Sequence, residues 1–192
     1  MIQALYVDTA SGPYAELLGA ENCWGVERNA KTYEGPGPGV YHPPCGPWGR
    51  LKALCTLQDP TCGPRAVEQV MRYGGVLEHP AHSALWRHCE LPLPSPPSAG
   101  WLFQPRAWTL EIEQCRWGHK AKKNTWLLFV GIRPQDLPPI PGWIEPTHCV
   151  DDGAARKAGR PSKWLKLRSD ETHITPPAFA RWLIECAKTA RA

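Results

Sequence analysis

The sequence contains no long apolar run, no Cys-x-x-Cys pair and no Gly-x-x-x-x-Gly-Lys loop. A helix that crosses a bilayer needs about 20 apolar residues, so we expect no membrane partner. The missing phosphate-binding loop argues against a nucleotide kinase. The eight cysteines lack the spacing of a small secreted disulfide framework, and Met1 opens a short apolar strand rather than a signal peptide. We therefore expect a cytoplasmic protein with reduced thiols.

Proline, glycine and tryptophan are abundant instead, at 22, 17 and 10 of the 192 residues. This composition predicts long ordered loops rather than a compact helical bundle. The length suits a single domain, residues 1–192, with irregular loops at 91–100 and 133–161. A formal net charge of +4 permits a polyanionic partner without requiring one.

Strand-like and helix-like segments alternate through the first half of the chain. Strands are expected at Ile2–Val7, Cys23–Val26, Gly39–Tyr41 and Val76–Leu77, and helical segments at Tyr14–Leu18, Asn29–Tyr33 and Ala66–Tyr73. This order predicts an α/β fold with a mostly parallel sheet and a site at the carboxyl ends of its strands. Further along, Trp108–Gln114 and Thr125–Val130 predict an antiparallel hairpin, and Pro176 and Pro177 open a terminal helix.

Two reactive side chains follow neighbouring strands of this predicted sheet. Cys45 stands behind Pro43 and Pro44 after the third strand, and Glu78 follows the next strand. Neighbouring strands lie about 5 Å apart, so the thiol and the carboxyl can face one ligand. The pair suits attack on a pyrimidine ring, in which the thiolate adds to C6 while a desolvated glutamate with a raised pKa protonates N3. The structural alternatives are an inert cysteine in a proline turn and a glutamate that caps a helix or pairs with a cation.

Five motifs occur in an order that resembles the DNA cytosine-5 methyltransferases. Val-Tyr-His-Pro-Pro-Cys at residues 40–45 is similar to the family's Pro-Cys nucleophile motif, and Val-Leu-Glu-His-Pro at 76–80 is similar to its Glu-Asn-Val motif. Residues 23–33 resemble the acidic motif that binds the cofactor ribose. Residues 117–131 resemble the basic eighth motif before its strand, and residues 174–183 resemble the closing Pro-Pro helix motif.

The resemblance implies an abbreviated Rossmann-like class I methyltransferase fold and a transferase that uses S-adenosylmethionine. The target would be cytosine in duplex DNA with a flipped base, in single-stranded DNA or in a pyrimidine nucleotide. The brevity of the chain would suit a phage or prophage gene. The implied residues are Cys45, Glu78 and His79 for catalysis, Asp8, Glu27, Pro43, Thr175 and Pro176 for the cofactor, and Trp48, Lys120, Lys122 and Lys123 for nucleic acid.

The sequence departs from the family pattern in several places. Residues 7–14 hold one glycine where the family has a glycine-rich loop, and the segment from Tyr33 to Cys45 is too short for the family's third motif. His79 replaces the asparagine of Glu-Asn-Val, lysines replace the arginines of the eighth motif, and a large target-recognition domain is missing. These differences leave a second interpretation open, namely a catalytically inactive DNA-binding or decoy protein with the methyltransferase fold.

Histidines and cysteines leave further alternatives. His42 is either structural or an imidazolium that lowers the pKa of the Cys45 thiol, and His79 is either structural or a partner of Glu78. A zinc site is conceivable from His42, Cys45, Cys55 and Cys62, with Cys115 and His119 as a looser pair. Because these spacings are not those of a zinc knuckle, we expect no metal.

Overall fold

The computed structural model describes residues 1–49, 59–94, 106–150, 159, 162–168 and 171–191. Its centre is a six-stranded sheet with the strand order β2-β1-β3-β4-β6-β5. The strands are β1 (Gln3–Leu5), β2 (Cys23–Trp24), β3 (Gly39–Tyr41), β4 (Gly75–Pro80), β5 (Ala107–Glu113) and β6 (Asn124–Val130). Neighbours from β2 to β4 run parallel, and β6 is antiparallel to both β4 and β5. The predicted α/β fold with a mostly parallel sheet and a hairpin is therefore confirmed, and it is compatible with a Rossmann-like fold.

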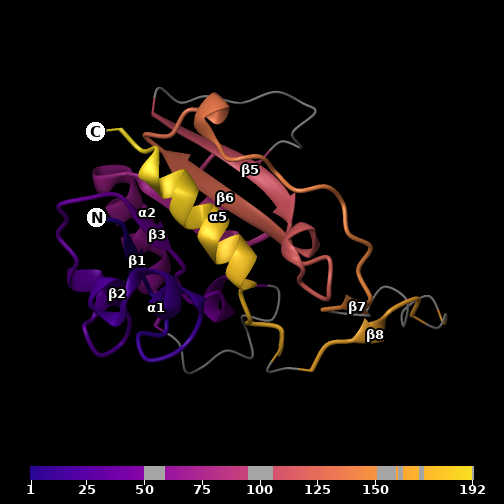
Figure 1. Ribbon diagram of the computed structural model, residues 1–192. Helices are drawn as coiled ribbons and strands as arrows, with labels where there is room; N and C mark the ends of the chain where they lie inside the picture. Colours follow the sequence, from indigo (N-terminus) through magenta and orange to yellow (C-terminus); the bar gives the residue numbers. More distant parts are fainter. Residues whose placement is uncertain (50–58, 95–105, 151–158, 160–161, 169–170, 192) are drawn as a thin grey trace.

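Helices cover both faces of this sheet. The short α1 (Pro13–Leu18) and the terminal α5 (Pro177–Lys188) share one core with strand residues such as Val76. The other core joins α2 (Cys62–Tyr73) and α3 (Ala84–His88) to residues such as Leu77. Because successive side chains of a strand point to opposite faces, β4 contributes to both cores. For the same reason its polar residues Glu78 and His79 point to opposite faces of the sheet. Figure 1 shows α5 lying across the sheet beside β6.

The predicted elements differ from the observed ones chiefly at their ends. The strand expected at Val76–Leu77 extends over all of β4, and α2 begins at Cys62, with Pro64 in its first turn, where the ring removes no intrahelical hydrogen bond. The predicted turn at Asn29–Tyr33 is present as η2 (Ala30–Thr32). The other single turns are η1 (Ala20–Asn22), η3 (Gly46–Trp48), η6 (Gln114–Trp117) and η7 (Pro134–Asp136).

A short helix and a second, two-stranded sheet were not predicted. Helix α3 begins at Ser83, whose hydroxyl accepts a hydrogen bond from the Leu85 amide and so caps the helix. The region expected to be an irregular loop at 133–161 contains β7 (His148–Cys149), which pairs in parallel with β8 (Leu165–Lys166) in a separate small sheet. Residues 95–105, 151–158 and 160–161 of the two expected loops lie outside the described residues.

Glycine is required where β4 begins. Gly75 has a φ of +113°, and a β-carbon there would lie 2.0 Å from the carbonyl oxygen of Gly39, its partner in β3. The Gly74–Gly75 pair therefore does more than end α2, because it lets β3 and β4 approach each other closely.

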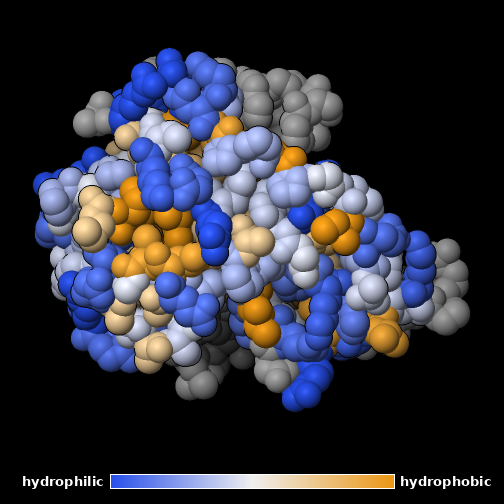
Figure 2. Space-filling view, in the orientation of Figure 1, coloured by the Kyte–Doolittle hydropathy of each residue, from blue (hydrophilic) through white to orange (hydrophobic). Residues whose placement is uncertain are grey.

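One face of the molecule carries an apolar area beside α5 (Figure 2). Leu17, Leu18 and Ala190 are partly buried against the core that α1 and α5 share. None of the helices among the described residues has the length and apolar character needed to span a membrane.

Candidate active site

A cavity of about 540 Å³ lies at the carboxyl ends of β1, β3 and β4. It is lined by residues 6–8 and 11–14 after β1, residues 42–45 after β3, Glu78 and Pro80 of β4, Lys123 before β6, and residues 172–175 before α5. The chain leaves β1 toward β2 on one side, while β3 pairs with β1 on the other. Such a switch point is where open α/β sheets bind ligands.

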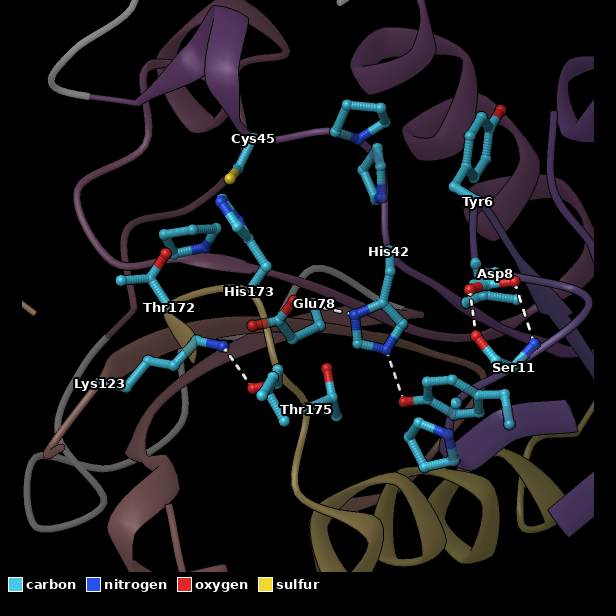
Figure 3. Close-up of a pocket in the computed structure, with 18 residues that line it drawn as sticks. Tyr6, Asp8, Ser11, His42, Cys45, Glu78, Lys123, Thr172, His173 and Thr175 are labelled. Carbon is cyan, nitrogen blue, oxygen red and sulfur yellow. Dashed lines mark hydrogen bonds and ion pairs between the residues drawn. The ribbon is translucent and has the colours of Figure 1, made fainter. Parts of the chain in front are cut away.

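Glu78 is the centre of a buried polar network in this cavity. One carboxylate oxygen accepts a hydrogen bond from His42 Nδ1 at 2.9 Å (Figure 3), and the other accepts one from Gln114 Nε2 at 3.1 Å. The same Gln114 amide also donates to Thr125 Oγ1 at 2.9 Å. Both carboxylate oxygens are thus held by donors from different elements, which fixes the orientation of the group.

The protonation state of Glu78 is the opposite of what the sequence led us to expect. Burial raises the pKa of this carboxyl, but the hydrogen bond and charge of His42, together with the charge of Lys123, outweigh burial and hold the pKa below its usual range. The prediction of a raised pKa was wrong because His42 and Lys123, which lower the pKa of Glu78, come from distant segments of the chain. Glu78 is therefore an anion that accepts hydrogen bonds in the resting site.

His42 uses both ring nitrogens within the network. Its Nε2 lies 2.5 Å from the hydroxyl of Tyr14, and its Nδ1 faces Glu78. Burial and the charge of Glu78 raise the pKa of Tyr14 well above its usual value, so Tyr14 remains a phenol. Both ring nitrogens of His42 are therefore engaged by Tyr14 and Glu78, and the expected effect of an imidazolium on the pKa of the Cys45 thiol stays a prediction.

Lys123 belongs to the cavity rather than to a surface patch. Its Nζ donates to the carbonyl of Ile174 at 3.0 Å and so ties the hairpin to the segment before α5. Burial lowers the pKa of the ammonium, whereas the negative charges of Glu78 and Cys45 raise it. The Lys123 cation therefore lies within electrostatic reach of both predicted catalytic groups.

Cys45 lies at the rim of the same cavity. It is half-buried, and its carbonyl accepts hydrogen bonds from the Trp48 and Gly49 amides, which forms η3 and fixes the turn. In Figure 3 the sulfur points into the cavity, and the imidazole of His173 points toward it. His173 was not predicted, although it lies two residues before Thr175 and its motif neighbour Pro176.

His79 lies on the opposite face of β4 from Glu78. It is fully buried beside Trp86 and is not one of the cavity-lining residues. Burial lowers the pKa of its imidazole to about 4, although the Pro44 carbonyl lies close enough to oppose the shift. Neither ring nitrogen makes a well-formed hydrogen bond with the described residues. The structure therefore does not support the expected catalytic role of His79, since strand alternation turns it away from the cavity.

The residues expected at a cofactor are only partly brought together. Asp8, Pro43 and Thr175 line the cavity, whereas Glu27 and Pro176 do not. The Asp8 carboxylate accepts hydrogen bonds from the amides of Ala10 and Ser11 and from the Ser11 hydroxyl. The first loop thus satisfies its own amides instead of directing them at a ligand.

The loops after β1 and β2 also pack against each other. The Tyr6 amide donates to the Trp24 carbonyl at 2.7 Å, and a β-carbon on Gly25 would lie 2.5 Å from the Val7 carbonyl oxygen. Glu27 accepts a hydrogen bond from the Thr9 hydroxyl at 3.2 Å and is exposed. Its carboxylate is therefore not directed at the cavity as a ribose ligand would be.

The residues expected to contact nucleic acid do not form one patch. Lys120 pairs with Glu171 at 2.5 Å, and Lys122 lies 3.8 Å from Glu113. Trp48 lines a second, more open cavity of about 520 Å³ at the start of α2. Of the four, Lys123 alone lines the cavity that holds Cys45.

The conceivable zinc site gains no support from the residues that the structure describes. They contain no group of three or more histidine, cysteine or acidic side chains that could hold a metal ion. Cys55 of the suggested set lies outside the described residues, and both nitrogens of His42 are engaged by Tyr14 and Glu78. His119 directs its Nδ1 at the backbone of Ala121.

The chain matches no protein-family model, no curated protein and no solved structure. Its function therefore has to be argued from the cavity. A thiol, an ionised carboxylate and an ammonium converge there, and this set can add a nucleophile to a polarised ring while holding the charge that develops.

Proposed function

We propose that this protein is a pyrimidine C5-modifying enzyme, and more specifically a DNA cytosine-5 methyltransferase that uses S-adenosylmethionine. The observation that carries the proposal is the convergence of Cys45, Glu78 and Lys123 in one cavity at the switch point of the sheet. A protein that only binds DNA has no need of a thiol placed beside a buried, oriented carboxylate. The motif order that resembles the methyltransferases supports the same chemistry.

The reaction begins with addition of the Cys45 thiolate to C6 of the pyrimidine. The new bond between sulfur and C6 pushes the electrons of the C5–C6 double bond into the C4–C5 bond, and the electrons of the C4–N3 double bond onto N3, which takes a proton from solvent in the cavity. C5 then has the character of an enamine carbon and acts as a nucleophile. Lys123 stabilises the thiolate before attack, because its ammonium lies near both Cys45 and Glu78.

Glu78 performs a different task from the one its sequence position suggested. As an anion it accepts a hydrogen bond from the exocyclic amine of cytosine and, once N3 is protonated, from the N3 hydrogen. Uracil has a carbonyl oxygen where cytosine has that amine, and this oxygen would face the carboxylate with an unpaired acceptor. The ionised state of Glu78 thus favours cytosine over uracil.

The methyl donor would occupy the β1 side of the cavity. When bound, S-adenosylmethionine would supply the methyl group that C5 takes. Asp8, Pro43 and Thr175 fit contacts to it because they line the cavity, whereas Glu27 does not fit in its present position. We propose DNA as the carrier of the base, and a duplex would have to release the base from its stack at a cost of roughly a few kcal/mol.

One observation favours a second candidate, an inactive DNA-binding or decoy protein of the same fold. The loops after β1 and β2 satisfy several of their polar groups within and between themselves, so these groups are not directed at a cofactor. A shortened relative that had lost cofactor binding would show this arrangement. The intact network around Glu78 favours the enzyme.

The decisive test is covalent trapping on DNA that contains 5-fluorocytosine, followed by intact-mass analysis. We expect an adduct with S-adenosylmethionine present, lost in Cys45→Ala and retained in Cys149→Ala, which removes another half-buried thiol outside the cavity. The proposal fails if no adduct forms under any cofactor condition and calorimetry detects no binding of S-adenosylmethionine. An adduct that forms without methyl transfer would indicate another C5 chemistry.

A further inference from the structure

Tyr14, His42 and Glu78 form a continuous hydrogen-bonded chain along the wall of the cavity. These hydrogen bonds connect α1, which holds Tyr14, with β4, which holds Glu78, through His42 in the turn that follows β3. His42 Nε2 lies 2.5 Å from the Tyr14 hydroxyl, and His42 Nδ1 lies 2.9 Å from the Glu78 carboxylate (Figure 3). All three side chains line the cavity. The addition of Cys45 described above makes no use of His42 or Tyr14.

We propose that His42 is a positioning residue that balances the charge of Glu78 by holding an exchangeable proton on Nε2, with Tyr14 as the partner of that proton. This inference rests on the proposed function. In it, His42 carries the Nε2 proton before the pyrimidine ring is protonated and releases it when N3 takes one.

Tyr14 makes both protonation states of His42 compatible with the same geometry. A phenol hydroxyl can donate one hydrogen bond and accept others. It accepts from Nε2–H when His42 is a cation, and it donates to the bare Nε2 when His42 is neutral. Because burial keeps Tyr14 protonated, the hydroxyl remains available for both tasks. In both states Nδ1–H continues to donate to Glu78.

The charged groups around His42 explain why such a balance is needed. Tyr14 and Glu78 contact its ring directly, Lys123 acts on Glu78 from the hairpin, and His79 lies behind it on the other face of β4. His79 is held neutral by burial, so it contributes no compensating charge near neutral pH. The proton on His42 is then the adjustable charge in contact with Glu78.

Protons and electrons balance over the cycle. On addition, the sulfur–C6 bond forms, N3 gains a proton from the cavity, and His42 loses one from Nε2 toward the cavity by way of Tyr14. On elimination after methylation, the C5 hydrogen leaves as a proton to solvent, and its bonding electrons form the C5–C6 double bond as the sulfur–C6 bond breaks and restores the Cys45 thiolate. The proton on N3 then returns to His42 Nε2. The addition thus leaves the total charge of the site unchanged, because the proton that N3 takes is matched by the one that His42 gives up. One proton leaves to solvent for each methyl group transferred.

The first test is the pH profile of adduct formation on 5-fluorocytosine DNA. His42→Asn retains an amide that can donate to Glu78 but cannot ionise. We expect it to slow adduct formation about 100-fold near neutral pH, as expected for loss of a positioned proton-holding group. We also expect one limb of the wild-type pH profile to disappear.

Tyr14→Phe removes the acceptor for Nε2–H, so we expect a smaller loss of rate and a shift of the same limb to lower pH. His148→Asn, at a histidine that does not line the cavity, should leave rate and profile unchanged. A merely structural role of His42 predicts equal slowing at every pH, and a profile with its limb intact in a folded His42→Asn protein would overturn the proposal. Thermal melts establish which variants fold.

A second measurement needs no activity and uses the wild-type protein. Nitrogen NMR of labelled histidine should show that Nδ1 of His42 stays protonated across the titration while Nε2 gains and loses its proton. A neutral form with the proton on Nε2 would overturn the inference. If this pattern is seen but wild-type protein forms no adduct, the proposed function fails while the hydrogen-bond assignment of His42 stands.

Discussion

The polar groups on the two sides of the cavity find their hydrogen-bond partners in different ways. On the β3 and β4 side, His42, Glu78 and Gln114 satisfy one another through side chains from distant segments, and they face the cavity. On the β1 and β2 side, Asp8 satisfies the amides of its own loop, and Glu27 binds the neighbouring loop. The first side is organised before any ligand arrives. The second side must give up local hydrogen bonds in order to bind one.

The largest contrast should appear when one carboxylate is removed from each side. Glu78→Ala leaves His42, Gln114 and Lys123 without their buried partner, so we expect the free energy of unfolding to fall by roughly 3–5 kcal/mol. Asp8→Ala removes an exposed carboxylate and should cost much less. Urea denaturation of both variants measures the difference, and equal losses would contradict the contrast between the two sides.

Acid should destabilise the protein through the histidine behind the β4 side of the cavity. Since the pKa of His79 is about 4 in the folded chain and 6.5 when unperturbed, the unfolded chain binds more protons between these values. Stability is then full above pH 6.5 and falls by roughly 3 kcal/mol as the pH decreases to about 4. Urea denaturation across this range should show the loss in wild-type protein and in His148→Asn.

His79→Leu should remove this loss. The lowered pKa of Glu78 acts with the same sign, because its stabilisation decreases as the pH falls below the ordinary glutamate range. That contribution persists in His79→Leu, so the difference between the two proteins isolates the histidine. An unchanged pH dependence in the variant would show that His79 is not the group responsible.

The two lysines of the hairpin should differ in their effect on rate. Lys123→Met removes the cation near Cys45 and Glu78, and we expect adduct formation to slow about tenfold or more. Lys120→Met breaks only a surface pair with Glu171 and should change the rate by less than about twofold. If the two substitutions slowed adduct formation equally on a free-nucleotide substrate, the placement of Lys123 in the site would be contradicted.

The smallest effect should come from Glu27→Gln. Because Glu27 is exposed and bonded to Thr9, we expect the affinity for S-adenosylmethionine to change by less than about twofold in calorimetry. The family resemblance would instead require a large loss. A loss of tenfold or more would show that the loops after β1 and β2 separate when the ligand binds.

The sequence allowed the positions of Cys45 and Glu78 to be predicted because hydrophobic pattern and turn residues clearly mark β3, which Cys45 follows, and β4, in whose second half Glu78 lies. It did not reveal the partners of Glu78, since His42 and Gln114 each lie 36 residues away. The sign of the Glu78 pKa shift was wrong for this reason. Burial can be inferred from a local pattern, whereas the charge that offsets burial comes from tertiary contacts.

Other misses have similar physical causes. Lys123 was grouped with Lys120 and Lys122 because all three lie in the segment that resembles the basic eighth motif, but its left-handed backbone, with φ +42°, lies where the chain turns into β6. His79 was paired with Glu78 as its neighbour in sequence, although adjacent strand residues point to opposite faces. Tyr14 and His173 come from a short helix and a loop whose placement no local pattern fixes.

The close contact of Gly39 with Gly75 has a consequence for the alignment of the site. If β4 slid by one residue against β3, Val76 would bring a β-carbon to the position where only a glycine fits. The same slip would turn His79 into the cavity and bury the Glu78 carboxylate beside Trp86, away from His42 and Gln114. The close contact of Gly39 with Gly75 at the start of β3 and β4 thus fixes the register of the two strands, and this register places the Glu78 carboxylate in the cavity.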